Sequence, residues 1–240
     1  MNMQSTIIGA PVTQIEGPSK VTGRTRYAAD VDLPGMLWGK ILRSPHPHAR
    51  IVRIDASNAW TVPGVKAVVT GQDAPGHLMG KVLRDMPVLC WDRVRYIGDR
   101  VAAVAAETPE AAEEAVLLIE VDYELLPAVF DPMEAMKPDA PLIHEDVASY
   151  SGAPVDVLAT DVHNGQTRLA WVKGDLDEGF RQADIILEHS FGVPSRHQGY
   201  LEPFASVISI DDAGRIQAWC SSKAPFRARL QLAQAMGLQD

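Results

Sequence analysis

The alternation of apolar and polar positions is clearest between residues 98 and 124. An apolar run at 101–106 has the length of a buried strand. Thr108 and Pro109 follow it and suit the start of a helix, because a threonine hydroxyl caps free amides and proline needs no amide donor there. A second apolar run at 115–121 indicates a strand that ends near residue 124. The region therefore predicts a strand, a helix and a strand in succession.

The same kind of pattern predicts further elements on both sides of this region. Strands are expected at residues 36–42, 49–54, 65–69, 167–173, 185–193, 205–210 and 216–220, and a strand with flanking turns is expected at 88–96, where apolar and charged residues mix. The strands at 205–210 and 216–220 are joined by a short loop that contains Gly214, which is typical of an antiparallel hairpin. Helices are expected at 175–183 and 225–236, and an extended lead-in at 1–26.

A change in composition divides the chain. Between residues 127 and 166 prolines recur at short intervals and the apolar periodicity is lost. Connections of this length are uncommon inside one compact domain, so we expect a domain boundary there. We assign residues 1–145 to a first domain, 146–166 to a linker and 167–240 to a second domain.

The overall composition is that of a globular protein and narrows its functional class. Hydrophobic residues make up 46% and charged residues 22% of the 240 residues. The net charge of -9 argues against nucleic acid as a partner, because a phosphate backbone needs a basic surface. No stretch approaches the roughly 20 apolar residues of a membrane span, and the N-terminus does not read as an export signal. A cytoplasmic location is therefore expected, unless a partner subunit carries an export signal for a whole complex.

Few residues offer metal or redox chemistry. Cys90 and Cys220 are the only cysteines, too few for an iron–sulfur cluster, and two free thiols are expected although a disulfide between them stays open. His46 and His48 lie two residues apart, but no third ligand stands nearby, so no metal site is predicted. Caps or solvated turns are expected for three scattered loop carboxylates, which are Asp92, Asp99 and Glu107.

Several motifs, taken in order, resemble those of one enzyme family. They are GPSKVTG at 17–23, YAAD at 27–30, GMLWG at 35–39, LRSPHPHARI at 42–51, VPGV at 62–65, GDRVA at 98–102, EVDYELLPAV at 120–129 and HQGYLEP at 197–203. Together they resemble the large subunits of molybdenum hydroxylases, the family of xanthine dehydrogenase, aldehyde oxidase and carbon monoxide dehydrogenase. The resemblance implies an α+β fold. It consists of an N-terminal α/β hammerhead domain followed by the first, incomplete portion of a molybdopterin-binding domain.

The resemblance gives the HQGYLEP segment a position close to the inner face of the cofactor domain. His197, Gln198, Tyr200 and Glu202 are then expected to line a substrate channel or to support the cofactor from behind. The alternative is that the histidine and glutamate close a strand edge by pairing with backbone groups or with each other. No residue of the chain is expected to be catalytic.

Ser222 and Lys223 are the expected cofactor-binding residues, and the second departs from the family pattern. The family usually has Ser/Thr-Gln-x-Pro where this chain has Ser222-Lys223-Ala224-Pro225, and its glutamine can donate a hydrogen bond to an oxygen on molybdenum. A lysine is a charged donor without an acceptor. Either the metal environment differs, or Lys223 is a solvated lysine beside a helix N-terminus and the assignment fails there.

In the family, the sequence beyond the position of Leu238 runs into a glycine-rich pterin loop and later supplies a glutamate as general base. The 240 residues do not contain these segments, so we expect a chain that is inactive alone and exposes apolar surface to a partner. The function implied is the N-terminal portion or split subunit of a molybdopterin-dependent oxidoreductase. Such an enzyme hydroxylates an aldehyde or an aromatic N-heterocycle with water as the oxygen source.

The expected partners follow from this function. A second chain would carry the remaining molybdopterin domain and hold most of the molybdenum cofactor. An iron–sulfur subunit, with or without a flavin (FAD) subunit, would take the electrons. The alternative is a non-catalytic protein, either truncated or repurposed as a hammerhead binding module.

Overall fold

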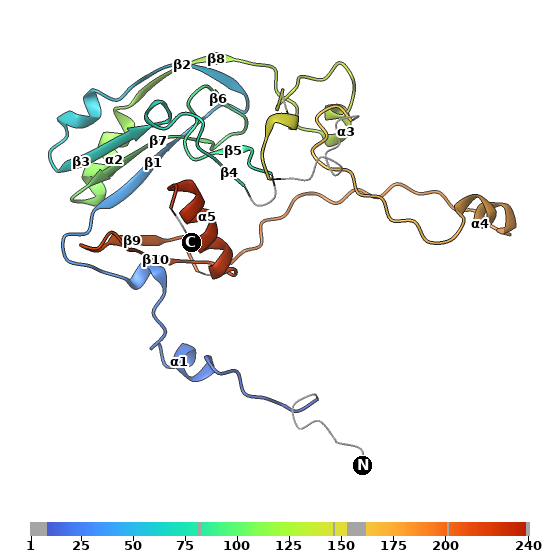
Figure 1. The fold of residues 1–240 in the computed structure, drawn as a ribbon, viewed down its shortest axis with the longest axis horizontal. Coiled ribbons are helices and arrows are strands. Elements are labelled where there is room, and N and C mark those ends of the chain that lie inside the picture. The colour runs from blue at the N-terminus through green and yellow to red at the C-terminus, as the bar shows by residue number, and fades with distance from the viewer. Residues whose placement is uncertain (1–8, 81–82, 146, 153–161, 201, 239–240) are drawn as a thin grey trace. The chain divides into compact units, whose positions relative to one another are not determined.

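The computed structural model describes residues 9–80, 83–145, 147–152, 162–200 and 202–238 (Figure 1). The chain divides into two compact units. The smaller unit combines Met1–Pro34 with Gly192–Lys223, and the larger one combines Gly35–Phe191 with Ala224–Asp240. In the described ranges, no helix is both long and apolar enough to cross a membrane.

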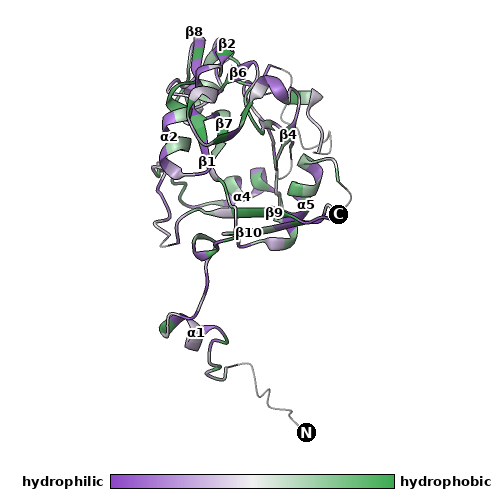
Figure 2. Ribbon diagram, turned by 90° about the vertical axis from the view of Figure 1, so that its left-hand side faces the viewer, coloured by the Kyte–Doolittle hydropathy of each residue, from purple (hydrophilic) through white to green (hydrophobic). Residues whose placement is uncertain are grey.

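The larger unit is built on a three-stranded antiparallel sheet with the order β1-β7-β3. Its central strand, β7 (Arg100–Ala106), pairs with β1 (Trp38–Arg43) and with β3 (Val65–Thr70). Because β7 is covered on both faces, its sequence is a nearly continuous apolar run, and Figure 2 shows its ribbon largely in green. The predicted strand at 101–106 is therefore confirmed.

Helix α2 (Pro109–Leu117) follows β7 and packs against β1, β3 and β7. The Thr108 hydroxyl accepts a hydrogen bond from the amide of Ala111 at 3.1 Å, which is the predicted cap. Ala115 of this helix contributes to a core that also contains Ala102 and Val104. The predicted helix and its start are confirmed.

A second antiparallel sheet has the order β6-β2-β8 and completes the larger unit. Its strands are β6 (Arg93–Val94), β2 (Ala49–Asp55) and β8 (Glu120–Leu125). The strand after α2 begins at Glu120 rather than at residue 115, because the apolar residues from 115 to 117 still belong to the helix. The two strands that flank α2, β7 and β8, lie in different sheets.

Further elements are short. They are α1 (Gly17–Val21), η1 (Ala28–Asp30), η2 (Asn58–Thr61), η3 (Gly71–Asp73), β4 (Leu78–Met79), β5 (Met86–Pro87), α3 (Pro132–Ala135), η4 (Val147–Ser149), α4 (Leu176–Gln182), β9 (Ser206–Ile210), β10 (Ile216–Cys220) and α5 (Pro225–Ala235). The hairpin β9–β10 and the helices α4 and α5 lie where the sequence predicts them, within one residue at each end.

Some predicted elements do not form. Residues 168–173 and 184–200 have no regular structure, so the strands expected at 167–173 and 185–193 are wrong. Strand residues need neighbours to accept and donate their backbone hydrogen bonds, and the described residues offer none to these two segments. Of the strand expected at 88–96, only β6 forms. Residues 1–8 of the extended lead-in expected at 1–26 lie outside the described residues, and the rest is interrupted by α1.

A buried polar cluster holds the turn between β6 and β7. Asp99 is 2% exposed, and its carboxylate accepts hydrogen bonds from the amides of Arg95 at 3.0 Å and Arg100 at 3.2 Å. Its backbone carbonyl accepts from the amide of Ser44 at 2.8 Å, and the Cys90 thiol also donates to the carboxylate. Of the two roles expected for Asp99, a cap or a solvated turn, the structure shows the first, because the carboxylate accepts turn amides while it is buried rather than solvated. The turn folds inward and uses the carboxylate as an internal acceptor.

Candidate functional site

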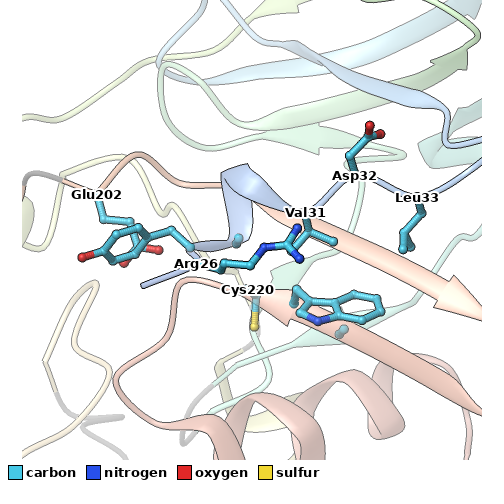
Figure 3. Close-up of a pocket in the computed structure, with 10 residues that line it drawn as sticks. Arg26, Val31, Asp32, Leu33, Glu202 and Cys220 are labelled. Atoms are coloured by element: carbon cyan, nitrogen blue, oxygen red, sulfur yellow. The ribbon is translucent and has the colours of Figure 1, made fainter. Parts of the chain in front are cut away.

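A hollow of about 480 Å³ lies in the smaller unit (Figure 3). One side is the segment around η1, and the other is β10 together with Glu202. The lining residues are Arg26, Tyr27, Ala28, Val31, Asp32, Leu33, Glu202, Ala218, Trp219 and Cys220. Two of the motifs recognised in the sequence, YAAD and HQGYLEP, thus meet at one place although about 170 residues separate them.

Local hydrogen bonds fix the segment that carries η1. The Tyr27 amide donates to the Asp30 carboxylate at 2.8 Å, and the Asp30 amide donates to the Tyr27 carbonyl at 3.0 Å. The Arg26 guanidinium donates to the Asp30 carbonyl at 2.7 Å. These three contacts close a single turn, and Arg26 extends from it among the residues that line the hollow (Figure 3).

Glu202 ties the turn before β9 to the end of β10. The Ser221 hydroxyl donates to the Glu202 carboxylate at 2.9 Å and lies 3.3 Å from the Pro203 carbonyl. Glu202 is half-buried, and Ser222 and Lys223 follow Ser221 directly along the chain. The carboxylate therefore sets where the chain leaves β10. The alternative given for Glu202, pairing with backbone groups or with His197, differs from this contact, because the partner of the carboxylate is a serine side chain.

The other three residues expected beside a substrate channel do not line the hollow. His197, Gln198 and Tyr200 are exposed in the irregular segment that precedes Glu202. The His197 and Tyr200 rings lie in contact with centroids 4.9 Å apart and planes tilted by 50°, and the Gly199 amide donates to His197 Nδ1 at 3.1 Å. The structure brings one of the four, Glu202, to the hollow, and the role of the others stays a prediction.

Ser222 and Lys223 lie beside the hollow in sequence, and both side chains are exposed. In the part of the chain that the structure describes, no carboxylate pairs with the Lys223 ammonium. The ammonium is thus available to an anionic group from outside the chain. This is compatible with cofactor binding and with a solvated lysine.

Sequence reasoning missed Arg26, Asp32 and Trp219 as members of the site. Arg26 and Asp32 flank the YAAD motif, and that proximity is the signal that could have found them. The hollow carries one cation and two carboxylates in its lining, with aromatic rings from Tyr27 and Trp219. Such a lining can bind and orient a group. In the described residues, no three metal-ligating side chains come together.

The two cysteines differ in reactivity. Cys220 is exposed, whereas Cys90 is fully buried, and both are free thiols as the sequence predicts. Burial raises the pKa of the Cys90 thiol, and the neighbouring Asp99 carboxylate raises it further. Iodoacetamide is therefore expected to modify Cys220 alone in the native chain and both cysteines in urea, as counted by mass spectrometry. The variant C220S should remain unmodified until it unfolds. Labelling of Cys90 in the native chain would contradict this.

A second hollow, of about 340 Å³, lies in the larger unit. Its lining residues are Leu83, Asp85, Val129, Ala135, Ile143, His144, Val147, Tyr150, Asn164 and Gln166. His144 Nδ1 lies 2.9 Å from the Tyr150 hydroxyl, and the two rings meet edge to face. The hollow is separate in the chain from the first one and shares no residue with it.

Stability should depend on the protonation of His144. Burial lowers its pKa below the ordinary value of 6.5, as do the positive charges of Arg95 and Arg93, while Asp85 and Asp99 oppose them. As the pH falls through 6.5, the unfolded chain gains a proton there that the folded chain does not, so the free energy of unfolding decreases.

Urea unfolding at pH 7.5 and pH 5.5 measures this effect. The chain should lose more stability between the two pH values than the variant H144Q, which cannot titrate at this position. The variant H189Q provides a matched control, because His189 is exposed and should leave the wild-type pH dependence unchanged. Equal losses in wild type and H144Q would contradict the prediction.

Two family models match the chain in succession. The aldehyde oxidase and xanthine dehydrogenase a/b hammerhead domain matches residues 22–127, and the molybdopterin cofactor-binding domain matches residues 160–240. A curated relative from Bacillus subtilis (strain 168), named as a probable xanthine dehydrogenase subunit, is 38% identical over 94% of this chain and 28% of its own length. The nicotinate dehydrogenase large molybdopterin subunit of Eubacterium barkeri is 33% identical over 98% of this chain and 52% of its own length.

Solved structures agree with these relatives. A crystal structure of the Cu,Mo-CO dehydrogenase superposes with a TM-score of 0.82 at 34% identity, over 96% of this chain and 30% of that one. Quinoline 2-oxidoreductase from Pseudomonas putida 86 superposes with a TM-score of 0.75 at 29% identity, over 95% of this chain and 28% of that one. The chain thus spans between about a quarter and a half of the length of these proteins. It belongs to the large-subunit family of the molybdenum hydroxylases and carries the hammerhead domain and the first portion of the molybdopterin-binding domain.

Proposed function

We propose that this chain supplies the N-terminal portion of a molybdopterin-dependent oxidoreductase and works only together with the remaining cofactor domain. The reaction proposed is hydroxylation of an aldehyde or an aromatic N-heterocycle, with water as the oxygen source. The observation that carries the proposal is the pair of family models, hammerhead and then cofactor domain, matched in order along one chain. The names of two relatives, nicotinate dehydrogenase and quinoline 2-oxidoreductase, support a heterocyclic substrate.

Exposed apolar side chains support the need for a partner. Trp171 is 93% exposed, Val193 90% and Phe191 89%, and all three lie in segments without regular structure. Large apolar groups exposed in this way mark a surface that another chain covers. The proposed partner is the polypeptide that carries the rest of the molybdopterin domain.

The donors after β10 fit an anionic cofactor. The Lys223 ammonium is exposed and has no carboxylate partner among the described residues, and the Ser222 hydroxyl stands next to it. These two side chains would donate hydrogen bonds to an anionic oxygen of the cofactor, with the Glu202–Ser221 contact fixing the end of β10 behind them. When bound, molybdopterin with its molybdenum supplies the two-electron redox centre.

Other parts of the proposal concern the complex as a whole. An iron–sulfur subunit, with or without a flavin subunit, would remove the electrons from the molybdenum centre. The cytoplasm is the proposed compartment, and its support is the pair of free cysteines, which a reducing environment preserves. None of the chain's own residues is proposed as the catalytic base.

Gentle affinity purification of the chain from its native source tests the proposal. The eluate should contain molybdenum, measured by inductively coupled plasma mass spectrometry. It should also contain the polypeptide that carries the rest of the cofactor domain. The chain expressed alone should bind the hydrophobic dye ANS, and the complex should bind much less. A chain that is free of metal and partner and does not bind ANS would refute the proposal in favour of a non-catalytic hammerhead protein.

Variants at Lys223 test its role in the same purification. K223A should retain several-fold less molybdenum, since one charge-assisted hydrogen bond is lost. K223Q restores the residue that is usual in the family and should retain more than K223A. K173A is the matched control, because Lys173 is also exposed. Equal molybdenum contents in K223A and K173A would show that Lys223 is only a solvated lysine.

A further inference from the structure

The hollow around His144 has the features of a ligand site, although it lies outside the site described for the cofactor. Its lining residues come from three parts of the larger unit, at residues 83–85, at 129–145 with 147–150, and at 164–166. Its volume of about 340 Å³ falls at the lower end of the range for small-molecule sites. Apolar walls with a few convergent polar groups are typical of such sites.

Most polar groups of the lining are already used by the fold. Asn164 accepts from the Ile143 amide at 2.9 Å and donates to the carbonyls of Ala135 at 2.9 Å and Pro141 at 3.0 Å. These bonds hold the walls together and leave Asn164 little capacity for a ligand. Asn164 therefore serves to connect the segments that line the hollow rather than to bind a ligand.

Two side chains keep capacity for a ligand. The Asp85 carboxylate accepts from Gln166 at 2.8 Å through Oδ2, so its Oδ1 remains open among the described residues. His144 uses Nδ1 with Tyr150, which leaves Nε2. Because burial lowers its pKa, His144 is a neutral imidazole at pH 7.5, with one nitrogen that donates and one that accepts.

We propose that this hollow binds a small planar N-heterocycle that carries at least one N–H group. The N–H donates to the Asp85 carboxylate, and a second ring nitrogen bonds to the His144 imidazole. The flat faces of the ring pack on apolar walls such as Leu83, Val129 and Ile143. The carboxylate disfavours anions, so a carboxylate or phosphate ligand does not suit the hollow.

Binding would join segments that are far apart in the sequence. Asp85 belongs to the loop that precedes β5, whereas His144 and Tyr150 come from the connection after α3. A ligand held by both is expected to raise the thermal unfolding midpoint, because it binds the folded chain alone. The inference concerns the cofactor-free chain and stands independently of the proposed hydroxylase function.

Benzimidazole is a suitable probe, since it is planar and has one N–H and one acceptor nitrogen. Isothermal titration of the full chain at pH 7.5 should give saturable binding, with a rise in the melting temperature. The compound 1-methylbenzimidazole lacks the N–H and should bind about tenfold more weakly, which is the size of one lost charge-assisted hydrogen bond. Benzoate should not bind.

Variants localise the binding. D85N and H144Q should each weaken benzimidazole binding about tenfold, whereas D212N, at an exposed aspartate of the β9–β10 loop, should not change it. Circular dichroism checks that each variant is folded. If H144Q does not fold, D85N still tests the site. The absence of saturable binding to wild type, or equal affinity of D85N and D212N, would overturn the inference.

Discussion

Replacing Gly71 by alanine is expected to lower the free energy of unfolding by about 3 kcal/mol. Gly71 begins η3 and is buried against the backbone of residues 90 and 91. A Cβ atom at Gly71 would overlap the carbonyl group of Cys90 and lie 2.7 Å from the Trp91 amide nitrogen. Since these are backbone atoms, no side-chain rotation can relieve the clash.

Relief would require a shift of the chain around Cys90, whose amide donates to the Arg100 carbonyl at 2.7 Å and so anchors this segment to β7. Urea unfolding followed by circular dichroism measures the loss. The variant G39A is the control, because a Cβ at Gly39 in β1 meets no atom within 4 Å. Equal stabilities of G71A and G39A would show that the close approach of the two backbones is not a constraint.

The variant D99A is expected to destabilise the larger unit by about 2–4 kcal/mol, because it leaves buried donors without an acceptor. The carboxylate is the acceptor for the amides of Arg95 and Arg100 and for the thiol of Cys90. Alanine at this position would fill none of these roles. The midpoint of urea unfolding gives the loss of stability.

Two further variants separate the acceptor role from the charge. D99N keeps one acceptor oxygen and should be less destabilised than D99A, whereas D92A, at an exposed neighbour, should stay within about 0.5 kcal/mol of wild type. D99A should also make Cys90 easier to alkylate, because the thiol loses its acceptor and the negative charge that raises its pKa. A D99A chain as stable as D92A would contradict the proposed role.

Local pattern was sufficient for much of the hammerhead fold. The strand β7 and the cap of α2 could be predicted because a buried run and Thr108-Pro109 are signals contained in a few neighbouring residues. Which strands pair within the hammerhead domain was not predicted. β7 lies between β1 and β3, and β8 pairs with β2, through contacts between residues far apart in sequence. The buried position of Asp99 escaped prediction for the same reason.

The strands expected at 167–173 and 185–193 illustrate the opposite error. Apolar residues such as Ile185 and Leu187 give these segments strand-like sequences, but they are 77% and 78% exposed. Sequence pattern reports the preference of a segment and cannot report whether a neighbour is present to pair with it. The preference is then expressed only when a partner strand is available.

The candidate site was predictable at one of its two sides. Glu202 stands in a recognisable motif and lines the hollow, whereas Arg26 and Asp32 reach it only because η1 packs beside β9. The second hollow had no signal in the sequence. Its polar groups are Asp85, His144 and Tyr150, which are separated along the chain. They come together where Asn164 forms hydrogen bonds to the connection after α3.

The smaller unit is formed by two segments that lie far apart in the sequence, and this has a consequence for synthesis on the ribosome. Its N-terminal part, which includes η1, emerges first, and the β9–β10 hairpin against which it packs emerges about 180 residues later. At about 5–20 residues per second, this interval lasts roughly 10 to 40 s. The sheets β1-β7-β3 and β6-β2-β8 can fold during the interval. The nascent N-terminal segment meanwhile lacks the hairpin against which it packs. Chaperones and proteases therefore have their best access to residues 9–34 before the hairpin is made.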